Sequence, residues 1–338
     1  MTVTIEDIRA AARRIAGKAV LTPLLESPLL NDRLGCRLLV KAENLQLTGS
    51  FKFRGAFNRI SQLDDATRAK GVVAYSTGNH AQGVAAAAKA AGTRAVIVIP
   101  KDAPEIKKRN TRAWGAELVF HDRDTEDRVA IAEKIAKERG GAPIIPPFDH
   151  EQVIAGQGTI GIEIAEQAEA LGARPDLVVV PCGGGGLTAG ISTAIKALLP
   201  ATEIYMAEPA AYDDTRRSFA AGERLANDLS PGHGTTICDA LTAIMPGAIT
   251  FPINRRNVSG VVALDDDEAC AGLYAAFENL KLVLEPSGAI AIAAVVSGVL
   301  ARAKAIEGKT VVAVASGGNV DAATFTTALT RGAEFQSR

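Results

Sequence analysis

Residues 176–191, DLVVVPCGGGGLTAGI, decide the fold of this chain. The apolar, β-branched run at the start predicts a buried strand, and the residues after the glycines predict a helix. A plain strand-to-helix turn needs one glycine, and each further glycine raises the entropic cost of ordering the loop. The run makes sense where successive backbone N–H groups converge on an anion at a helix start. We therefore interpret residues 183–186 as a phosphate-binding loop. The pattern is neither GxGxxG nor GxxxxGK[ST], which disfavours a dinucleotide or a nucleoside triphosphate.

On both sides of this stretch, short β-rich runs alternate with helical stretches. Further strands are predicted at RLLVKAEN, GVVAYST, RAVIVIP, AELVFH, APIIPPF, TEIYMAEP and TVVAVASGG, and a helix at residues 53–63 follows the first of them. This alternation predicts an α/β fold with open, twisted, mostly parallel sheets flanked by helices.

The block at residues 61–149 is complete in its own strands and helices. We therefore predict two domains: a large one built from residues 1–60 and 150–338, and a small, mobile one inserted between them. Because only 17 residues follow Asp321, we expect no C-terminal regulatory domain.

Composition and charge argue against several classes of partner. The formal net charge of −1 gives no electrostatic reason to expect nucleic acid or an anionic membrane surface. No apolar run approaches the ~20 residues that a membrane span needs. The first residues lack the apolar stretch and cleavage site of a signal peptide. The four cysteines form neither a CxxC pair nor a disulfide framework, so a reduced cytoplasmic protein is expected.

Lys52 lies between Phe51 and Phe53, just after a predicted buried strand. A lysine flanked by aromatic residues is unusual, because lysines normally remain in water. Partial desolvation lowers the pKa of a lysine and favours the free amine that a Schiff-base nucleophile requires. Read alone, such a lysine is more often a surface lysine whose amine reaches the solvent. Together with a phosphate loop it suggests pyridoxal phosphate (PLP).

Two further stretches place polar groups where predicted strands end. In YSTGNHAQG, residues 75–83, hydroxyls, an amide and N–H groups gather at a helix start and could hold a substrate carboxylate; an ordinary helix cap would look the same. In AVASGGNVD, residues 313–321, a buried strand delivers Ser316 and two glycines, a pattern that a plain turn also gives.

The motifs SFKFRGA, STGNHAQG, IAGQGTIGIEI, CGGGG, EPSGA and SGGN occur in this order. With them the chain resembles the fold-type II (tryptophan synthase β-like) PLP-dependent enzymes, specifically the family of threonine dehydratase (threonine ammonia-lyase) and serine racemase. The resemblance covers nearly the whole chain.

The resemblance implies roles for individual residues. Lys52 would carry PLP as a Schiff base and act as the catalytic base. The remaining cofactor contacts would be Phe51 on the ring, Asn79 at the ring hydroxyl, Ser316 at the pyridine nitrogen, Glu285, and the phosphate-binding Gly183, Gly184, Gly185, Gly186 and Leu187. The substrate would contact Ser76, Thr77, Asn79 and His80, with Thr77 also catalytic. A homodimer is the family habit.

The resemblance also implies a metal site in AEPAAYDD. Glu208, the carbonyl of Tyr212 and Asp214 match positions at which relatives bind Mg²⁺ or Ca²⁺, and oxygen ligands suit a hard divalent cation. A solvated acidic loop is the alternative. The ion would be structural or activating, since elimination requires no Lewis acid.

The implied reaction is elimination of water from a small β-hydroxy amino acid such as L-threonine or L-serine, giving a 2-oxo acid and ammonia. Unlike a carboxylate, the Ser316 hydroxyl cannot hold a pyridine nitrogen protonated, which suits elimination. Thr77 matches neither subgroup: family racemases place a serine there, and biosynthetic dehydratases tend to have alanine. PPFDH, residues 146–150, looks more like the dehydratases.

Other activities remain open at this stage. They are serine racemase and hydroxyaspartate dehydratase or racemase activity, a β-replacement synthase, and a non-catalytic protein that binds PLP or an amino acid. Arg128 is a candidate contact for a polar or acidic substrate side chain, although the pattern favours a solvated arginine on a helix face.

Overall fold

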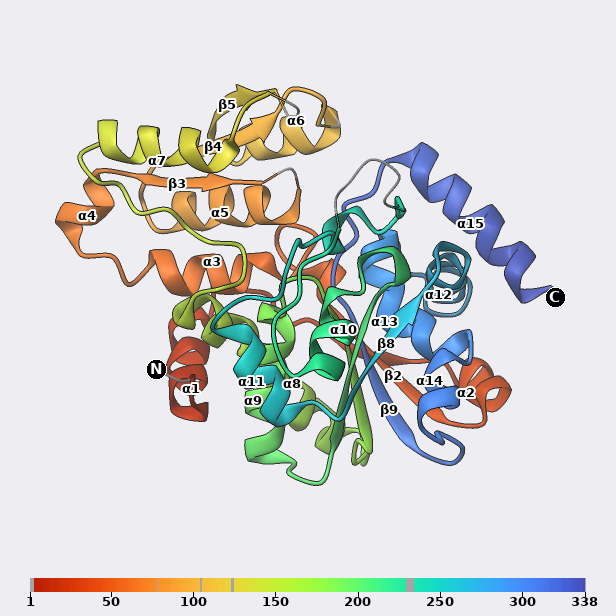
Figure 1. Ribbon diagram of the computed structural model, residues 1–338. Coiled ribbons are helices and arrows are strands. Elements are labelled where there is room, and N and C mark those ends of the chain that lie inside the picture. The colour runs from red at the N-terminus through yellow and green to blue at the C-terminus, as the bar shows by residue number, and fades with distance from the viewer. Residues whose placement is uncertain (1–2, 77, 104, 123–124, 229–233, 338) are drawn as a thin grey trace.

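The computed structural model describes residues 3–76, 78–103, 105–122, 125–228 and 234–337. Within them the strands form two separate sheets (Figure 1). The larger sheet has the order β1-β2-β9-β6-β7-β8, with β1 (Leu24–Glu26), β2 (Arg37–Ala42), β6 (Leu177–Pro181), β7 (Glu203–Pro209), β8 (Gly260–Leu264) and β9 (Thr310–Ala315). Strand β1 is antiparallel to β2, and the other pairs are parallel. The smaller sheet is parallel, in the order β3-β4-β5, with β3 (Val72–Tyr75), β4 (Ala95–Pro100) and β5 (Glu117–His121).

The larger sheet is covered on both faces. Leu177 and Val179 of β6 belong to a core cluster with residues of α12 (Asp266–Leu280) and α13 (Pro286–Val296). Val178 and Val180 belong to the opposite cluster, with residues of α8 (Glu151–Ala170) and α9 (Gly186–Leu198). Successive side chains of a strand point to opposite faces, so a parallel strand covered on both sides is apolar at consecutive positions.

The smaller sheet is also covered on both faces (Figure 1). Val72 and Ala74 pack in a cluster with residues of α3 (Lys52–Ile60) and α5 (Asn79–Ala90). Val73 packs on the other side with Ala132 and Ala136 of α7 (Arg128–Glu138). Helix α3 packs against both α5 and α8, and so lies between the two sheets. The domain limits and the mobility of the smaller unit remain predictions.

The remaining helical elements complete the structure. They are α1 (Ile5–Ile15), α2 (Pro28–Leu34), η1 (Glu43–Leu45), α4 (Asp65–Ala69), α6 (Glu105–Ala113), η2 (Ala210–Tyr212), α10 (Asp214–Ala221), η3 (Asp239–Leu241), α11 (Thr250–Asn257), α14 (Val299–Ala303) and α15 (Ala322–Gln336). None of the helices in the described residues combines the length and apolar character needed to cross a membrane.

The predicted α/β class is confirmed, but two local predictions need correction. The helix expected at residues 53–63 is α3, which begins at Lys52 and ends at Ile60. The strand expected at APIIPPF is wrong, since only Ile144 forms an isolated bridge there, with Val73. Pro143, Pro146 and Pro147 have no N–H to donate to a neighbouring strand, which explains why the pairing stops.

Candidate active site

A pocket of about 220 Å³ lies where strands of both sheets end. Strands β3, β6 and β9 end at Tyr75, Pro181 and Ala315, and the pocket is lined just beyond these ends by Ser76, Gly183 and Ser316. All of the predicted cofactor and substrate residues that the structure describes line this pocket, namely Phe51, Lys52, Ser76, Asn79, His80, Gly183, Gly184, Gly185, Gly186, Leu187, Glu285 and Ser316. Thr77 lies outside the described residues.

Lys52 is the first residue of α3, and its partly buried side chain lines the pocket. The Nζ atom donates a hydrogen bond to the carbonyl of Pro147 at 2.8 Å and lies 5.0 Å from the ring centroid of Phe51. Burial lowers the pKa of Lys52 to about 8, although the Glu285 carboxylate acts in the opposite direction. A substantial fraction of the amine is therefore uncharged near neutral pH, as a nucleophile or base requires.

The glycine loop fits tightly around Phe148. A Cβ atom on Gly184 would lie 2.4 Å from the Phe148 ring, and one on Gly186 would lie 2.8 Å from its Cβ. Gly185 has φ of 86°, a conformation that favours glycine, and immediately precedes α9. The first N–H groups of a helix lack a helical acceptor and carry a partial positive charge. The loop therefore suits an anion such as a phosphate.

A polar cluster forms the wall that contains Asn79. Its Nδ2 donates to Oε1 of Glu285 at 2.5 Å, and its Oδ1 accepts from Nδ2 of Asn319 at 2.7 Å. Burial raises the pKa of Glu285 to about 7, and Asp239 adds to this, while Lys107, Asn79 and Lys52 oppose it. Glu285 is therefore a carboxyl group that can gain or lose a proton near neutral pH.

Ser316 and His80 are fixed by backbone groups. The carbonyl of Ser316 accepts from the N–H of Phe51 at 3.1 Å, so the loop after β9 lies beside the residue before Lys52. The Nε2 atom of His80 lies 2.8 Å from the carbonyl of Ile145. Burial, with the Lys52 charge, lowers the pKa of His80 to about 3, so its imidazole is neutral.

The chain matches the family model described as "Pyridoxal-phosphate dependent enzyme" over residues 15–317. It belongs to that family. An amine with a lowered pKa, a glycine loop for a phosphate and a pocket joining them fit the cofactor, and the predicted PLP dependence and enzyme class are confirmed.

Named relatives fall into the predicted subgroups. The chain is 41% identical to the L-threo-3-hydroxyaspartate ammonia-lyase of Saccharomyces cerevisiae, with 94% of each protein covered. It is 39% identical to the catabolic L-threonine dehydratase of Escherichia coli, covering 95% of this chain and 94% of that protein. The structure of maize serine racemase matches with a TM-score of 0.90 and 37% identity, and both chains are covered completely. The predicted resemblance to this PLP-dependent ammonia-lyase and racemase family is confirmed.

Sequence reasoning missed the charged groups that join the two sides of the pocket. Lys107 of α6 pairs with Asp239 of η3, with Nζ and Oδ2 at 2.5 Å, and both residues line the pocket. Arg128 also lines it, with its guanidinium 5.7 Å from the ring centroid of Tyr75. Among its described lining residues, the pocket therefore has two cationic side chains besides Lys52. Arg128, one of them, has no carboxylate partner in the described part of the chain. The sequence already made Arg128 a candidate substrate contact. No motif or local pattern in the sequence points to Lys107 or Asp239.

The predicted metal residues lie together at the end of β7. Glu208 accepts hydrogen bonds from the N–H groups of Thr215 and Arg216 at 3.3 and 2.7 Å. Asp214 accepts from Asn227 through Oδ1, and its buried Oδ2 has no partner in the described part of the chain. Burial raises the pKa of Glu208 to about 8 and that of Asp214 to about 6. Two buried carboxyls, one of them with an unpartnered oxygen, fit the ligand chemistry of a divalent cation. No group of three His, Cys, Asp or Glu side chains suited to a metal occurs among the described residues.

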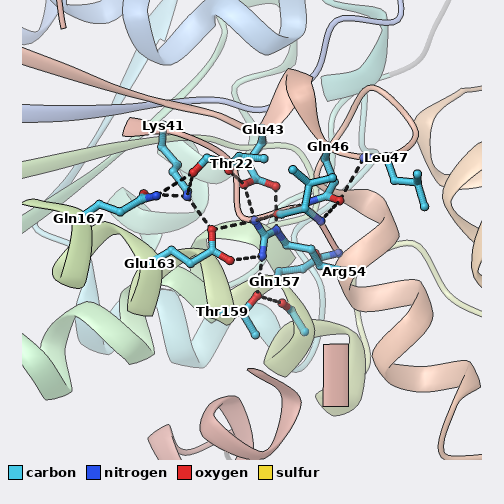
Figure 2. A network of polar contacts seen from close by, with 12 residues as sticks. Thr22, Lys41, Glu43, Gln46, Leu47, Arg54, Gln157, Thr159, Glu163 and Gln167 are labelled. Atoms are coloured by element: carbon cyan, nitrogen blue, oxygen red, sulfur yellow. Dashed lines mark hydrogen bonds and ion pairs between the residues drawn. The ribbon is translucent and has the colours of Figure 1, made fainter. Parts of the chain in front are cut away.

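A buried ionic network surrounds the guanidinium of Arg54, two residues after Lys52 in the chain (Figure 2). The guanidinium of Arg54 contacts the carboxylates of Glu43 and Glu163, and Lys41 donates to Glu163 at 2.6 Å. Arg54, Glu43 and Lys41 are fully buried. The network joins the end of β2 to α8 and to α3, the helix that begins at Lys52.

Proposed function

We propose that the protein is a lyase that eliminates water from a small β-hydroxy amino acid, such as L-threonine or L-serine, and yields a 2-oxo acid and ammonia. The observation that carries this proposal is the partly uncharged Lys52 amine, in a pocket that also contains the glycine loop and Ser316. When bound, PLP supplies an electron sink for the bond broken at the substrate's α-carbon.

Different side chains of the pocket can bind the substrate and transfer the protons that elimination requires. Ser76, Asn79 and the start of α5 offer hydrogen-bond donors to the substrate carboxylate. The Lys52 amine removes the α-proton, and the β-hydroxyl takes up a proton and leaves as water. The unsaturated amine that is released hydrolyses in water to the 2-oxo acid and ammonia. Ser316 offers only a hydroxyl, which cannot hold a ring nitrogen protonated and so favours elimination over a long-lived carbanion.

A substrate panel tests this proposal. The purified protein is given L-threonine, L-serine, D-serine and threo- and erythro-3-hydroxyaspartate, and 2-oxo acid, ammonia and inverted enantiomer are measured. We expect oxo acid and ammonia in equal amounts from at least one L-substrate, and none from Lys52→Ala. A colourless protein that forms no oxo acid would contradict the proposal. D-serine formed from L-serine at the rate of pyruvate would favour the racemase.

A second candidate substrate is L-threo-3-hydroxyaspartate. It is supported by Arg128, which offers the pocket a cation that no described carboxylate neutralises. A β-carboxylate is the feature that distinguishes this substrate from serine, and guanidinium groups bind carboxylates through paired hydrogen bonds. The yeast relative at 41% identity carries this activity in its name.

We further propose that the oxygens of Glu208, Tyr212 and Asp214 hold Mg²⁺ or Ca²⁺. The orphaned Oδ2 of Asp214 and the raised pKa of both carboxyls support it, because a cation would replace the missing positive charge. The ion would stabilise the loop between β7 and α10 and take no part in the elimination.

A homodimer is proposed from an exposed apolar surface. Val20, Leu21, Leu45, Leu47 and Val283 are all 42% or more exposed. Gln46 bonds both backbone groups of Val20, and Asn44 bonds the carbonyl of Val283, so these segments are neighbours. Contiguous apolar surface of this kind marks interaction sites. Sedimentation of the protein and of Leu21→Glu tests it; a monomeric wild type would contradict it.

The four cysteines are free thiols, as expected in the proposed cytoplasmic location.

A further inference from the structure

Helix α11 holds the far side of the glycine loop. The hydroxyl of Thr250 donates to the carbonyl of Gly184 at 2.7 Å, and Nδ2 of Asn254 donates to the carbonyl of Gly185 at 3.1 Å. Both side chains are buried. These bonds fix two loop carbonyls on the side of the loop that faces α11.

The contact between α11 and the loop is close. A Cβ atom on Gly185 would lie 2.7 Å from Nδ2 of Asn254 and 3.0 Å from Oγ1 of Thr250. The N–H of Gly247, just before α11, also donates to the carbonyl of Gly184 at 3.2 Å. Glycine runs lose much conformational freedom when they become ordered. The bonds from α11 oppose that freedom before any ligand binds.

Asp149 in turn holds the start of α11. Its carboxylate accepts hydrogen bonds from the N–H groups of Ala248 and Ile249 at 2.8 Å each, and of Thr250 at 3.2 Å. The first backbone N–H groups of a helix have no acceptor within the helix, and these three donors are of that kind. A Cβ atom on Gly247 would lie 2.3 Å from Oδ1 of Asp149, so the carboxylate is packed directly against this turn.

The segment that contains Asp149 also contacts Lys52 and the glycine loop. The carbonyl of Pro147 accepts from Nζ of Lys52, and the ring of Phe148 packs against Gly184 and Gly186. Three consecutive residues therefore contact the lysine, the loop and, through Asp149, the helix that holds the loop.

We propose that Asp149 and Thr250 are positioning residues for the glycine loop, which keep its N–H groups set for a phosphate at a fixed place relative to Lys52. Neither residue lines the pocket, so both act through the loop. The inference rests on the proposed role of residues 183–186 in binding phosphate. When a loop is ordered before its ligand binds, the entropic cost of binding is smaller and the affinity is higher.

The test compares two ligands that differ only in the phosphate. Cofactor-free protein is titrated with pyridoxal 5'-phosphate and with pyridoxal, and both affinities are measured by absorbance. The ratio compared between variants is the affinity for pyridoxal 5'-phosphate divided by the affinity for pyridoxal. We expect Thr250→Val to reduce this ratio roughly tenfold, about the effect of one well-placed hydrogen bond, and Asp149→Ala to reduce it further. The affinity for pyridoxal should change little, because Lys52 is untouched.

Asp265→Ala is the matched control. Asp265 caps α12 by accepting from the N–H of Glu268 at 2.8 Å, and it does not line the pocket. Its removal should leave the ratio unchanged. If Asp149→Ala does not fold, Thr250→Val decides alone.

The outcomes separate the inference from the function on which it rests. A wild type that binds both ligands equally would overturn the phosphate role of the loop and this inference with it. A wild type that strongly prefers the phosphorylated ligand, with the same preference in Thr250→Val and Asp149→Ala, would overturn the inference alone. Equal losses for both ligands would show a purely structural role and also overturn it.

Discussion

Arg54 and Glu43 form a fully buried ion pair in which Nε and Nη2 of the guanidinium each lie 2.8 Å from a carboxylate oxygen. The pair closes the segment from the end of β2 to the first turn of α3, and Lys52 lies within that segment. Glu163 of α8 binds the same guanidinium, so the start of α3 is tied to both neighbouring elements. The position of Lys52 therefore depends on buried charges outside the pocket.

Replacing Arg54 should strongly destabilise the protein. Arg54→Met leaves Glu43 and Glu163 without their main partner, and breaking one side of a buried ion pair costs about 3–5 kcal/mol. The free energy of unfolding of cofactor-free protein, measured in urea, checks this. Arg9→Met is the control, since Arg9 pairs with Glu6 at the surface, where ion pairs contribute little. Equal stability of the two variants would contradict the expectation.

The pH dependence of Lys52 should reflect its burial. With a pKa of about 8, about a quarter of the amine is uncharged at pH 7.5, against about one part in a thousand for a lysine in water. The uncharged form reacts, so modification of Lys52 by an amine reagent should rise with pH through a midpoint near 8. Peptide mass spectrometry on cofactor-free protein measures this.

Glu285→Gln should move that midpoint to lower pH. The Glu285 carboxylate favours the charged form of Lys52, so removing it lowers the pKa of the amine. Glutamine keeps an oxygen for the bond from Asn79. An unchanged or raised midpoint would show that the two groups do not interact as the geometry indicates.

The proposed cation should stabilise the protein through Glu208. At ~10 times its dissociation constant, Mg²⁺ or Ca²⁺ should raise the melting temperature by about 1–3 °C. Glu208→Gln should abolish the rise, because an amide is a weaker ligand than a carboxylate. Glu307→Gln, at an exposed position, should keep it. A wild type that does not respond to either ion would remove the metal from the proposal.

The parts of the site that sequence predicts are those whose signal is local. Lys52 and residues 183–186 follow β2 and β6, two parallel strands of one sheet, and the ends of such strands meet at one edge, so their convergence could be expected. The APIIPPF prediction failed because isoleucines suggest a strand while prolines prevent its hydrogen bonding.

The contacts that sequence could not predict join residues far apart in the chain. Lys107 and Asp239 are 132 positions apart, and Asp149 and Thr250 are 101 apart. Asp149 lies in the PPFDH stretch, but nothing in that stretch points to Thr250, and Lys107 and Asp239 look like ordinary surface charges. The first contact depends on how α6 faces η3, and the second on how the segment after α7 returns to α11. Both are set by the packing of whole elements, which leaves no periodic pattern in the sequence.

Arg128 should decide between substrates with and without a β-carboxylate. Arg128→Met removes a charged donor worth about 1.5–3 kcal/mol, so kcat/KM for L-threo-3-hydroxyaspartate should fall roughly 10- to 150-fold relative to L-serine. Lys107→Met should shift this ratio less, because Asp239 already neutralises Lys107. Arg128→Lys keeps the positive charge but cannot form a bidentate pair with a carboxylate. It should therefore show a smaller fall in relative kcat/KM than Arg128→Met. Initial rates of oxo-acid formation for both substrates measure the ratio. Equal losses for the two substrates would show that Arg128 supports the pocket without contacting the substrate side chain, and L-serine or L-threonine would then be the better assignment.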